Sequence, residues 1–151
     1  ADINEGAAQS LANELGASAV SADAIMTTPC DVLSPNALGA ILDEESIAAL
    51  DTAIIAGGAN NQLARSFHGE TVFKRDILYA PDYVINAGGI ISVAWEYLAR
   101  REGRVGSVAE VRARIEQIPG RLEEIWQKSA ATNTSPDVVA DRMAQELIGR
   151  G

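Results

Sequence analysis

One short run of residues limits the fold of this chain more than any other. Thr52–Ala56 is continuous, apolar and rich in β-branched side chains, and Gly57-Gly58 closes it, which is typical of a buried strand. A second such run, Ile77–Ala80, ends at Pro81. Helical segments lie between the strand-like runs, and this alternation predicts an α/β fold with a doubly wound, mostly parallel sheet.

Local signals place further elements in the first 80 residues. Asn4 is a suitable N-cap and Gly16 a suitable stop for a helix whose apolar residues recur at helical spacing. Asp43 with Ser46 begins a second, shorter helix. Two brief apolar runs are each short enough for a buried strand: Ala19-Val20 and Asp31–Leu33.

Only helices are expected after Pro81. The first of them carries its apolar residues on one face: Ile90, Ala94, Tyr97 and Leu98. Ser107 and Glu110 form a capping-box pattern in front of a long helix, in which Pro119 removes a backbone hydrogen bond and predicts a kink just before it. Ser135-Pro136 begins the last helix, with proline at its first position.

The composition argues against several classes of function. A formal net charge of −9 and a pI of about 4.5 disfavour binding to nucleic acids or anionic membranes. A lone Cys30 cannot form an internal disulfide, which favours a reducing compartment, and we expect a cytoplasmic protein. No apolar run reaches the roughly 18 residues of a membrane span, and nothing resembles a signal peptide. Because the chain begins with Ala1 rather than Met, we expect a truncated protein.

Few side chains suit conventional catalysis. His68 and Cys30 are the only residues of their types, so neither a metal cluster nor a familiar Cys/His pair is expected, and His68 is interpreted as a solvated or capping residue. What remains are glycine- and asparagine-rich turns directly after strands, Gly57–Asn61 and Asn86–Gly89. Ligands of open parallel sheets bind at this edge, although by spacing alone each segment is more typical of an ordinary turn.

The order of several segments is more informative than any single motif. Five segments appear in the order in which they occur in the glutamate/leucine/phenylalanine/valine dehydrogenase family: Ala1–Asn4, Cys30–Gly39, Ala56–Leu63, Tyr79–Gly89 and Ala140–Ala144. The chain resembles this family over essentially its whole length and looks closest to the leucine dehydrogenase branch. The resemblance implies a partial Rossmann-like NAD-binding domain over residues 1–100, followed over 101–151 by helices that pack back across the cleft.

The resemblance also implies which residues contact the cofactor. The positions similar to the family's cofactor-binding residues are Asp2, Ile3, Asn36, Ala37, Asn60 and Asn86. Asp2 resembles the acidic residue that binds the adenosine ribose, where a carboxylate repels a 2′-phosphate and favours NAD over NADP. Asn36, Ala37 and Asn60 resemble the loops that line the ribose and the nicotinamide, although the family usually has cysteine where Asn36 stands.

Ile90 and Val93 resemble the wall of the family's substrate side-chain pocket; without the resemblance we would interpret them as ordinary core residues. A buried glutamate side chain needs a hydroxyl or cationic partner, which Val93 does not offer. Relatives that use phenylalanine tend to have a small residue where Ile90 stands. The pair therefore favours oxidative deamination of a branched-chain amino acid to a 2-oxo acid, ammonia and NADH, with a phenylalanine or valine dehydrogenase as the alternative.

Parts of the family's pattern have no counterpart in this chain. The family's catalytic lysines and aspartate belong to an N-terminal substrate domain, and its glycine-rich turn to a first βα unit. We therefore expect the chain alone to contain no catalytic residue, to be inactive and to fold marginally, and the full-length protein to form homo-oligomers. The alternatives are a non-catalytic nucleotide-binding module and an oligomerisation module built on the C-terminal helices.

Overall fold

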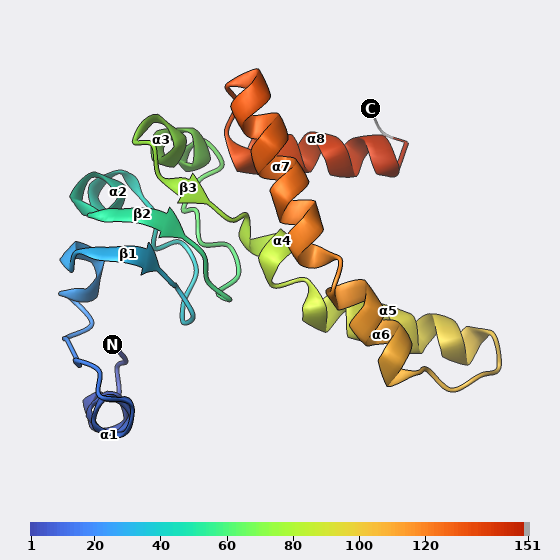
Figure 1. The fold of residues 1–151 in the computed structure, drawn as a ribbon, viewed down its shortest axis with the longest axis horizontal. Helices are drawn as coiled ribbons and strands as arrows, with labels where there is room; N and C mark the ends of the chain where they lie inside the picture. The colour runs from blue at the N-terminus through green and yellow to red at the C-terminus, as the bar shows by residue number, and fades with distance from the viewer. Residues whose placement is uncertain (150–151) are drawn as a thin grey trace.

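The computed structural model describes residues 1–149 and contains a three-stranded parallel sheet (Figure 1). Strands β1 (Cys30–Leu33), β2 (Thr52–Ile55) and β3 (Leu78–Tyr79) lie side by side in chain order. The predicted α/β class with a parallel sheet is confirmed. The run at Ile77–Ala80 is shorter than expected, because only its two central residues pair with β2.

The register of the strands separates a covered face of the sheet from an open one. Leu33, Ile55 and Tyr79 are partners in the ladder and are all buried. The preceding row follows the same register on the opposite face, where Val32 is 48% exposed and Leu78 38% exposed. Within the described residues, the predicted burial of the strands is therefore met on one face of the sheet only.

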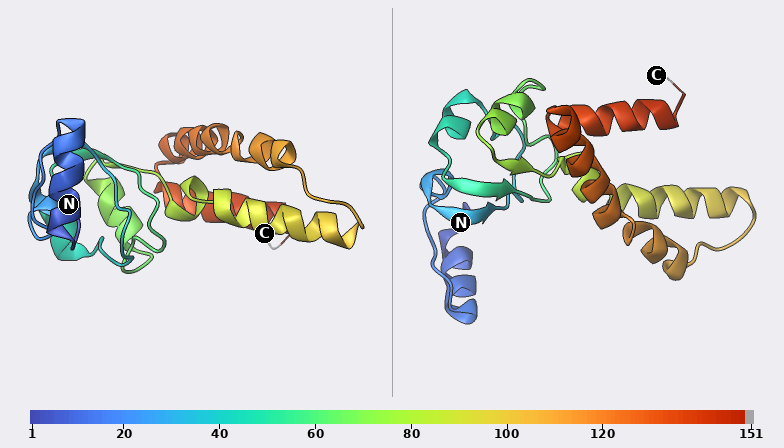
Figure 2. Two further views of the ribbon diagram at one scale, coloured as in Figure 1. Left: turned by 90° about the horizontal axis from the view of Figure 1, so that it is seen from below. Right: turned by 45° about the horizontal axis from the view of Figure 1, so that its top comes forward.

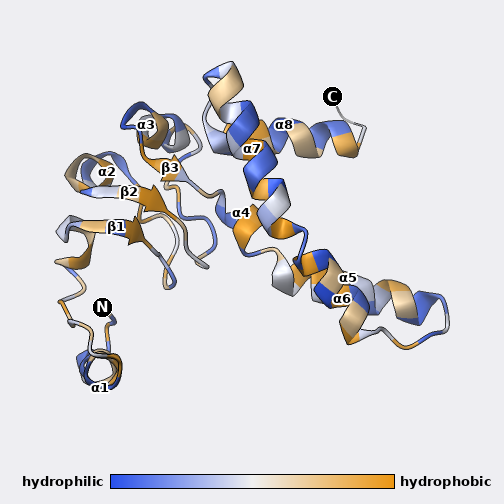
Figure 3. Cartoon of the chain, viewed as in Figure 1, coloured by the Kyte–Doolittle hydropathy of each residue, from blue (hydrophilic) through white to orange (hydrophobic). Residues whose placement is uncertain are grey.

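Two helices cover the buried row. Ile47 from α2 (Glu44–Ala49) and Val72 from α3 (His68–Lys74) are fully buried and pack in one cluster with the three strand residues of the covered face. Met26, from the short 3-10 helix η1 (Ile25–Thr27), packs at the margin of this cluster. Figure 3 shows hydrophobic residues at the carboxyl ends of β1 and β2, in the strands that this cluster includes. This cluster is the core that holds the three strand ends in place.

Helix ends follow the local signals closely. The Asn4 side chain accepts a hydrogen bond from the Ala7 backbone at the start of α1 (Glu5–Leu15), and Gly16 ends that helix in a left-handed conformation. Asp43 and Ser46 form the capping box of α2. These predictions are confirmed because each depends only on residues three or four positions apart.

The remaining helices form a second part of the molecule (Figures 1 and 2). They are α4 (Asp82–Ile85), α5 (Gly88–Arg101), α6 (Val108–Ile115), α7 (Ile118–Thr132) and α8 (Pro136–Leu147). Helices α5 and α6 run side by side away from the sheet, whereas α7 and α8 pack through Ile125, Val139 and Met143. Trp126 of α7 donates its indole N–H to the Tyr79 carbonyl at 2.9 Å and so joins these helices to β3.

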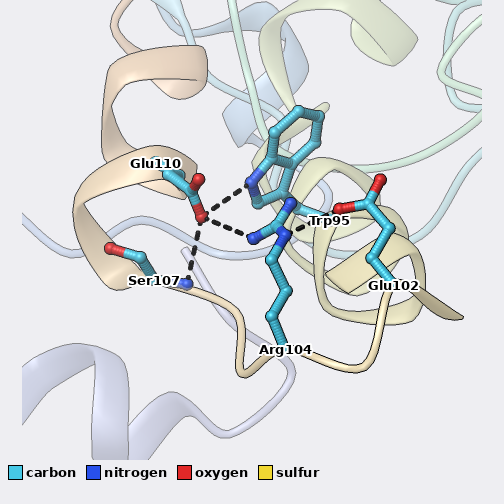
Figure 4. A network of polar contacts seen from close by, with 5 residues as sticks. All are labelled: Trp95, Glu102, Arg104, Ser107 and Glu110. Carbon is cyan, nitrogen blue, oxygen red and sulfur yellow. Dashed lines mark hydrogen bonds and ion pairs between the residues drawn. The ribbon is translucent and has the colours of Figure 1, made fainter. Parts of the chain in front are cut away.

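The turn between α5 and α6 is held by a small polar network (Figure 4). The carboxylate of Glu110 accepts hydrogen bonds from the Trp95 indole, the Arg104 guanidinium and the Ser107 backbone. The hydrogen bond from Trp95 is the main cause that lowers the pKa of Glu110. The predicted capping box at Ser107 is thereby confirmed. Its Glu110 carboxylate has two further hydrogen-bond donors, Trp95 and Arg104.

Three expectations for secondary structure and packing are wrong. Ala19-Val20 forms no strand, since it pairs with no other segment of residues 1–149. The long helix around Pro119 is two helices separated at Glu116-Gln117, because the proline occupies the first turn of α7, where no backbone donor is needed. The apolar face of α5, which was expected to pack inward, is exposed, and the buried residue of this helix is Ala99. None of the described helices is both long and apolar enough to cross a membrane.

A buried carboxylate lies where α8 meets α3. A Cβ atom on Gly69 of α3 would lie only 2.3 Å from a carboxylate oxygen of Asp137, so glycine allows the two helices to approach. Oδ1 of Asp137 is buried and accepts no hydrogen bond from the described residues. Burial raises the pKa of Asp137 against the opposing effect of its Ser135 contact and of the α8 N-terminus.

The two rows of the sheet should differ in their contribution to stability. We expect Ile55→Ala to lower the free energy of unfolding by about 2–5 kcal/mol, because it opens a cavity in the core. The matched change on the open face, Val32→Ala, should cost less than about 1 kcal/mol. Denaturant unfolding of both variants checks this, and equal losses would contradict the one-sided core.

The free energy of unfolding of the Asp137→Asn variant should increase relative to that of the parent as the pH rises. An acid whose pKa is raised by folding stabilises the fold while protonated, below its ordinary value of 3.8, and loses that contribution as the pH rises through the folded pKa. Asparagine is neutral throughout, so the stability difference between variant and parent should increase from about pH 3 to pH 7. Urea titrations at both pH values measure it, and a difference independent of pH would reject the buried carboxylate.

Candidate functional site

The segments that follow the three strands meet at the carboxyl edge of the sheet. Asn36, three residues after β1, accepts a hydrogen bond from the Gly58 backbone after β2 at 2.9 Å. Asn86, which follows α4 after β3, donates from Nδ2 to Oδ1 of Asn60 at 2.6 Å. Asparagine side chains thus connect the β1 loop to the β2 loop, and the β2 loop to α4, at the edge where ligands of parallel sheets bind.

Close backbone contacts make this convergence possible. A Cβ atom on Gly57 would lie 2.1 Å from the Pro35 carbonyl oxygen, so the loops after β1 and β2 are nearly in backbone contact. The Ala59 N–H donates to the same Pro35 oxygen at 2.9 Å. Further along the same two loops, the Ala40 N–H donates to the Asn61 carbonyl, and both residues have positive φ angles, which a non-glycine residue adopts at some energetic cost. The site is therefore built on a constrained backbone.

Four of the predicted cofactor residues surround one cavity of about 280 Å³: Asp2, Ile3, Asn36 and Ala37. The rest of its wall is largely apolar and includes side chains of η1 and of the segment that follows β1. Oδ1 of Asp2 accepts a hydrogen bond from the Asn4 backbone at 2.8 Å, which holds the carboxylate close to the chain. A mostly apolar cavity with one carboxylate and one amide is suited to a flat heterocycle joined to a hydroxylated sugar.

The other two predicted cofactor residues, Asn60 and Asn86, form the amide pair described above. Their mutual hydrogen bond uses the carbonyl oxygen of Asn60 and an N–H of Asn86, and the same Asn86 group lies 3.4 Å from the Gly58 carbonyl. Within residues 1–149, no hydrogen bond occupies the Asn60 amide nitrogen or the Asn86 side-chain carbonyl oxygen, so the pair offers one donor and one acceptor. That combination can bind another primary amide.

Ile90 and Val93 lie on α5, one and two turns beyond Asn86. Their side chains are 67% and 64% exposed, so within the described residues they pack into no core. Their alternative interpretation as core residues is therefore wrong here, while their role in a substrate pocket stays a prediction.

His68 differs from the expectation of a solvated residue. It is buried at the start of α3, and its Nδ1 accepts a hydrogen bond from the Arg65 backbone at 3.1 Å, which stabilises the turn that leads into the helix. Across residues 1–149, no group of histidine, cysteine, aspartate and glutamate side chains is arranged to hold a metal ion.

Sequence reasoning missed Gln62 and Asp82, the two buried polar residues behind the asparagine pair. Gln62 is fully buried and Asp82 is 6% exposed, and the Gln62 N–H donates to Oδ2 of Asp82 at 2.7 Å. Both residues lie inside the segments that carry the family resemblance. Their burial could not be inferred, because a polar residue beside a turn is usually exposed.

Comparison with known proteins identifies the relatives of this chain. The family model for glutamate/leucine/phenylalanine/valine dehydrogenase matches residues 3–148. The chain is 39% identical to a leucine dehydrogenase of Bacillus subtilis over 149 residues, which is 99% of this chain and 39% of that protein. It is 37% identical to a phenylalanine dehydrogenase of Caldalkalibacillus thermarum over 130 residues, or 86% of this chain and 34% of that protein.

A solved structure agrees with the sequence comparison. The L-tryptophan dehydrogenase of Nostoc punctiforme superimposes with a TM-score of 0.88 and 32% identity, covering 99% of this chain and 44% of that one. The chain thus spans between about a third and less than half of the length of the relatives it matches. These relatives act on different amino acids according to their names, so similarity alone does not select a substrate.

Replacing Gly57 should disturb the site more than replacing a glycine nearby. We expect Gly57→Ala to lower the free energy of unfolding by about 1–3 kcal/mol, because the new methyl group overlaps the Pro35 backbone. Gly89→Ala meets no atom within 4 Å and lies in a helix, so it should be neutral or stabilise by up to about 1 kcal/mol. Thermal or denaturant unfolding distinguishes the two, and a Gly57→Ala protein as stable as the parent would contradict the close contact.

Proposed function

The chain belongs to the glutamate/leucine/phenylalanine/valine dehydrogenase family, and on that premise we propose that it is the NAD-binding portion of an amino-acid dehydrogenase acting on branched-chain substrates. In this proposal residues 1–100 form the cofactor-binding part, and the helices within residues 101–149 pack back across the cleft. The catalytic groups come from a part of the gene product outside this chain. The complete protein is proposed to be a homo-oligomer.

The observation that carries the proposal is the arrangement of amide side chains at the carboxyl edge of the parallel sheet. Asn36 is bonded to the β2 loop, and Asn60 to Asn86, so the segments after all three strands share one edge. A dinucleotide bound along such an edge meets each loop in turn. The geometry therefore supports binding of an extended nucleotide more than of a compact ligand.

The cavity beside Asp2 fits the adenosine end of NAD. Its volume of about 280 Å³ is close to the lower end of the roughly 300–1,000 Å³ typical of small-molecule sites, which suits one nucleoside rather than a whole dinucleotide. The carboxylate of Asp2 would accept hydrogen bonds from ribose hydroxyls and would repel a 2′-phosphate, which favours NAD over NADP. Ile3 and Ala37 would provide apolar contact.

Asn60 and Asn86 would hold the carboxamide of the nicotinamide ring. Their free donor and acceptor complement a primary amide, and their mutual hydrogen bond orients both groups. When bound, NAD supplies the hydride acceptor for oxidation of the amino acid. The contribution of this chain would be to bind and orient that ring next to the substrate.

Ile90 and Val93 would select the substrate. Both side chains are aliphatic and accessible, so a leucine, valine or isoleucine side chain could pack on them. A glutamate side chain would lose hydration there without a hydroxyl or cation to replace it. Because named relatives act on phenylalanine and tryptophan, an aromatic substrate is the competing possibility within the family.

Steady-state assays of the gene product that carries this chain test the proposal. With NAD+ as acceptor, we expect kcat/KM for leucine, isoleucine or valine to exceed the values for glutamate, phenylalanine and tryptophan by about tenfold or more. NADP+ should be the poorer acceptor. A preference for glutamate or an aromatic amino acid would reject the pocket argument, and the absence of any NAD-linked amino-acid oxidation would reject the proposed function.

A further inference from the structure

We propose that Gln62 is a positioning residue for the nicotinamide end of the cofactor site, an inference that rests on the proposed function. Gln62 lies two residues after Asn60 and is fully buried. It therefore acts on the cofactor through the backbone of the loop that carries Asn60.

The side chain of Gln62 fixes the path of the β2 loop. Its Nε2 donates to the carbonyl of Gly57 at 2.8 Å and to the carbonyl of Ala59 at 3.0 Å. Both carbonyls precede Asn60 in the same loop, so one amide spans the distance from the end of β2 to the asparagine. An apolar side chain of equal volume would leave these two carbonyls without their donor.

The backbone of Gln62 connects the same loop to α4. Its N–H donates to Oδ2 of the buried Asp82, whose Oδ1 accepts the N–H of Tyr83 at 2.6 Å. Asp82 is the first residue of α4 and Asn86 directly follows the last one. The carboxylate therefore joins the Asn60 loop to the one-turn helix that carries Asn86, and together these contacts set the 2.6 Å hydrogen bond between the two asparagines.

The remaining polar atom of Gln62 shows that this arrangement is not optimal for stability alone. Its Oε1 is buried and accepts no hydrogen bond from the described residues. A buried acceptor without a donor destabilises a fold. The orientation of the amide is imposed by the two loop carbonyls, and the unpartnered oxygen is the cost of that loop geometry.

The test compares Gln62→Met with Val139→Ala in the gene product that carries this chain. Methionine matches the size of glutamine but cannot donate a hydrogen bond. Val139 belongs to the core between α7 and α8, so Val139→Ala is the control for a variant that only loses stability. We expect Gln62→Met to raise KM for NAD+ by about tenfold with little change in the KM of the amino acid. The side-chain NH₂ signals of Asn60 and Asn86 should also shift in nitrogen-15 NMR spectra of this variant.

Val139→Ala should melt at a lower temperature but keep the NAD+ KM and both NH₂ signals of the parent. A Gln62→Met protein with a NAD+ KM within about twofold of the parent, or with unmoved asparagine signals, would overturn the inference, as would an equal KM change in Val139→Ala. A parent protein that does not use NAD+ would overturn the proposed function itself. If Gln62→Met does not fold, Gln62→Asn supplies the same comparison, because it keeps a buried amide but withdraws it by one methylene group.

Discussion

The parallel pairing of β1, β2 and β3 is the constraint on which every other feature of this molecule depends. Parallel neighbours cannot be joined by hairpins, so β1 and β2 are each followed by a crossover, and the segments that leave all three strands begin at the same edge. The shared register of Leu33, Ile55 and Tyr79 fixes the ends of the strands relative to one another. Consequently, residues as distant in sequence as Asn36 and Asn86 become parts of one edge.

The side chains that connect the loops at this edge are neutral amides rather than charged groups. The chain as a whole carries a net charge of −9, but the convergent groups are the side chains of Asn36, Asn60 and Asn86. An amide provides a donor and an acceptor without the large desolvation penalty of a buried ion. The carboxylate of Asp82 is placed behind the loop, where it accepts hydrogen bonds from two backbone N–H groups. This division leaves Asp2 as the acidic group on the wall of the cavity, which is why its charge would decide between cofactors in our proposal.

The sequence predicted those features that depend on neighbouring residues. The caps at Asn4, Asp43 and Ser107 were correct because a cap is a contact across one helical turn. Ala19-Val20 was wrong because a strand needs a partner that local pattern does not reveal.

In the candidate site, too, some features followed from the sequence and others depend on the tertiary fold. That Asn60 and Asn86 would lie at one edge followed from the order of strands and turns, whereas their direct hydrogen bond depends on packing. Gln62 and Asp82 were missed because burial of a polar side chain is decided by the tertiary fold and not by its neighbours in sequence. The same reason explains the buried position of His68.

The exposed apolar surfaces indicate how binding and selectivity divide in the proposed enzyme. The cavity beside Asp2, which we propose for the adenosine end of the cofactor, is lined by residues from the N-terminal segment, from η1 and from the loop after β1. Ile90 and Val93, in contrast, are accessible on α5, and an aliphatic surface open to water discriminates weakly between side chains. Selection of a substrate by these residues requires a second surface that excludes water from them. In our proposal, cofactor binding therefore draws on the cavity beside Asp2 and on the amides at the sheet edge, whereas substrate selection requires that α5 face a second surface.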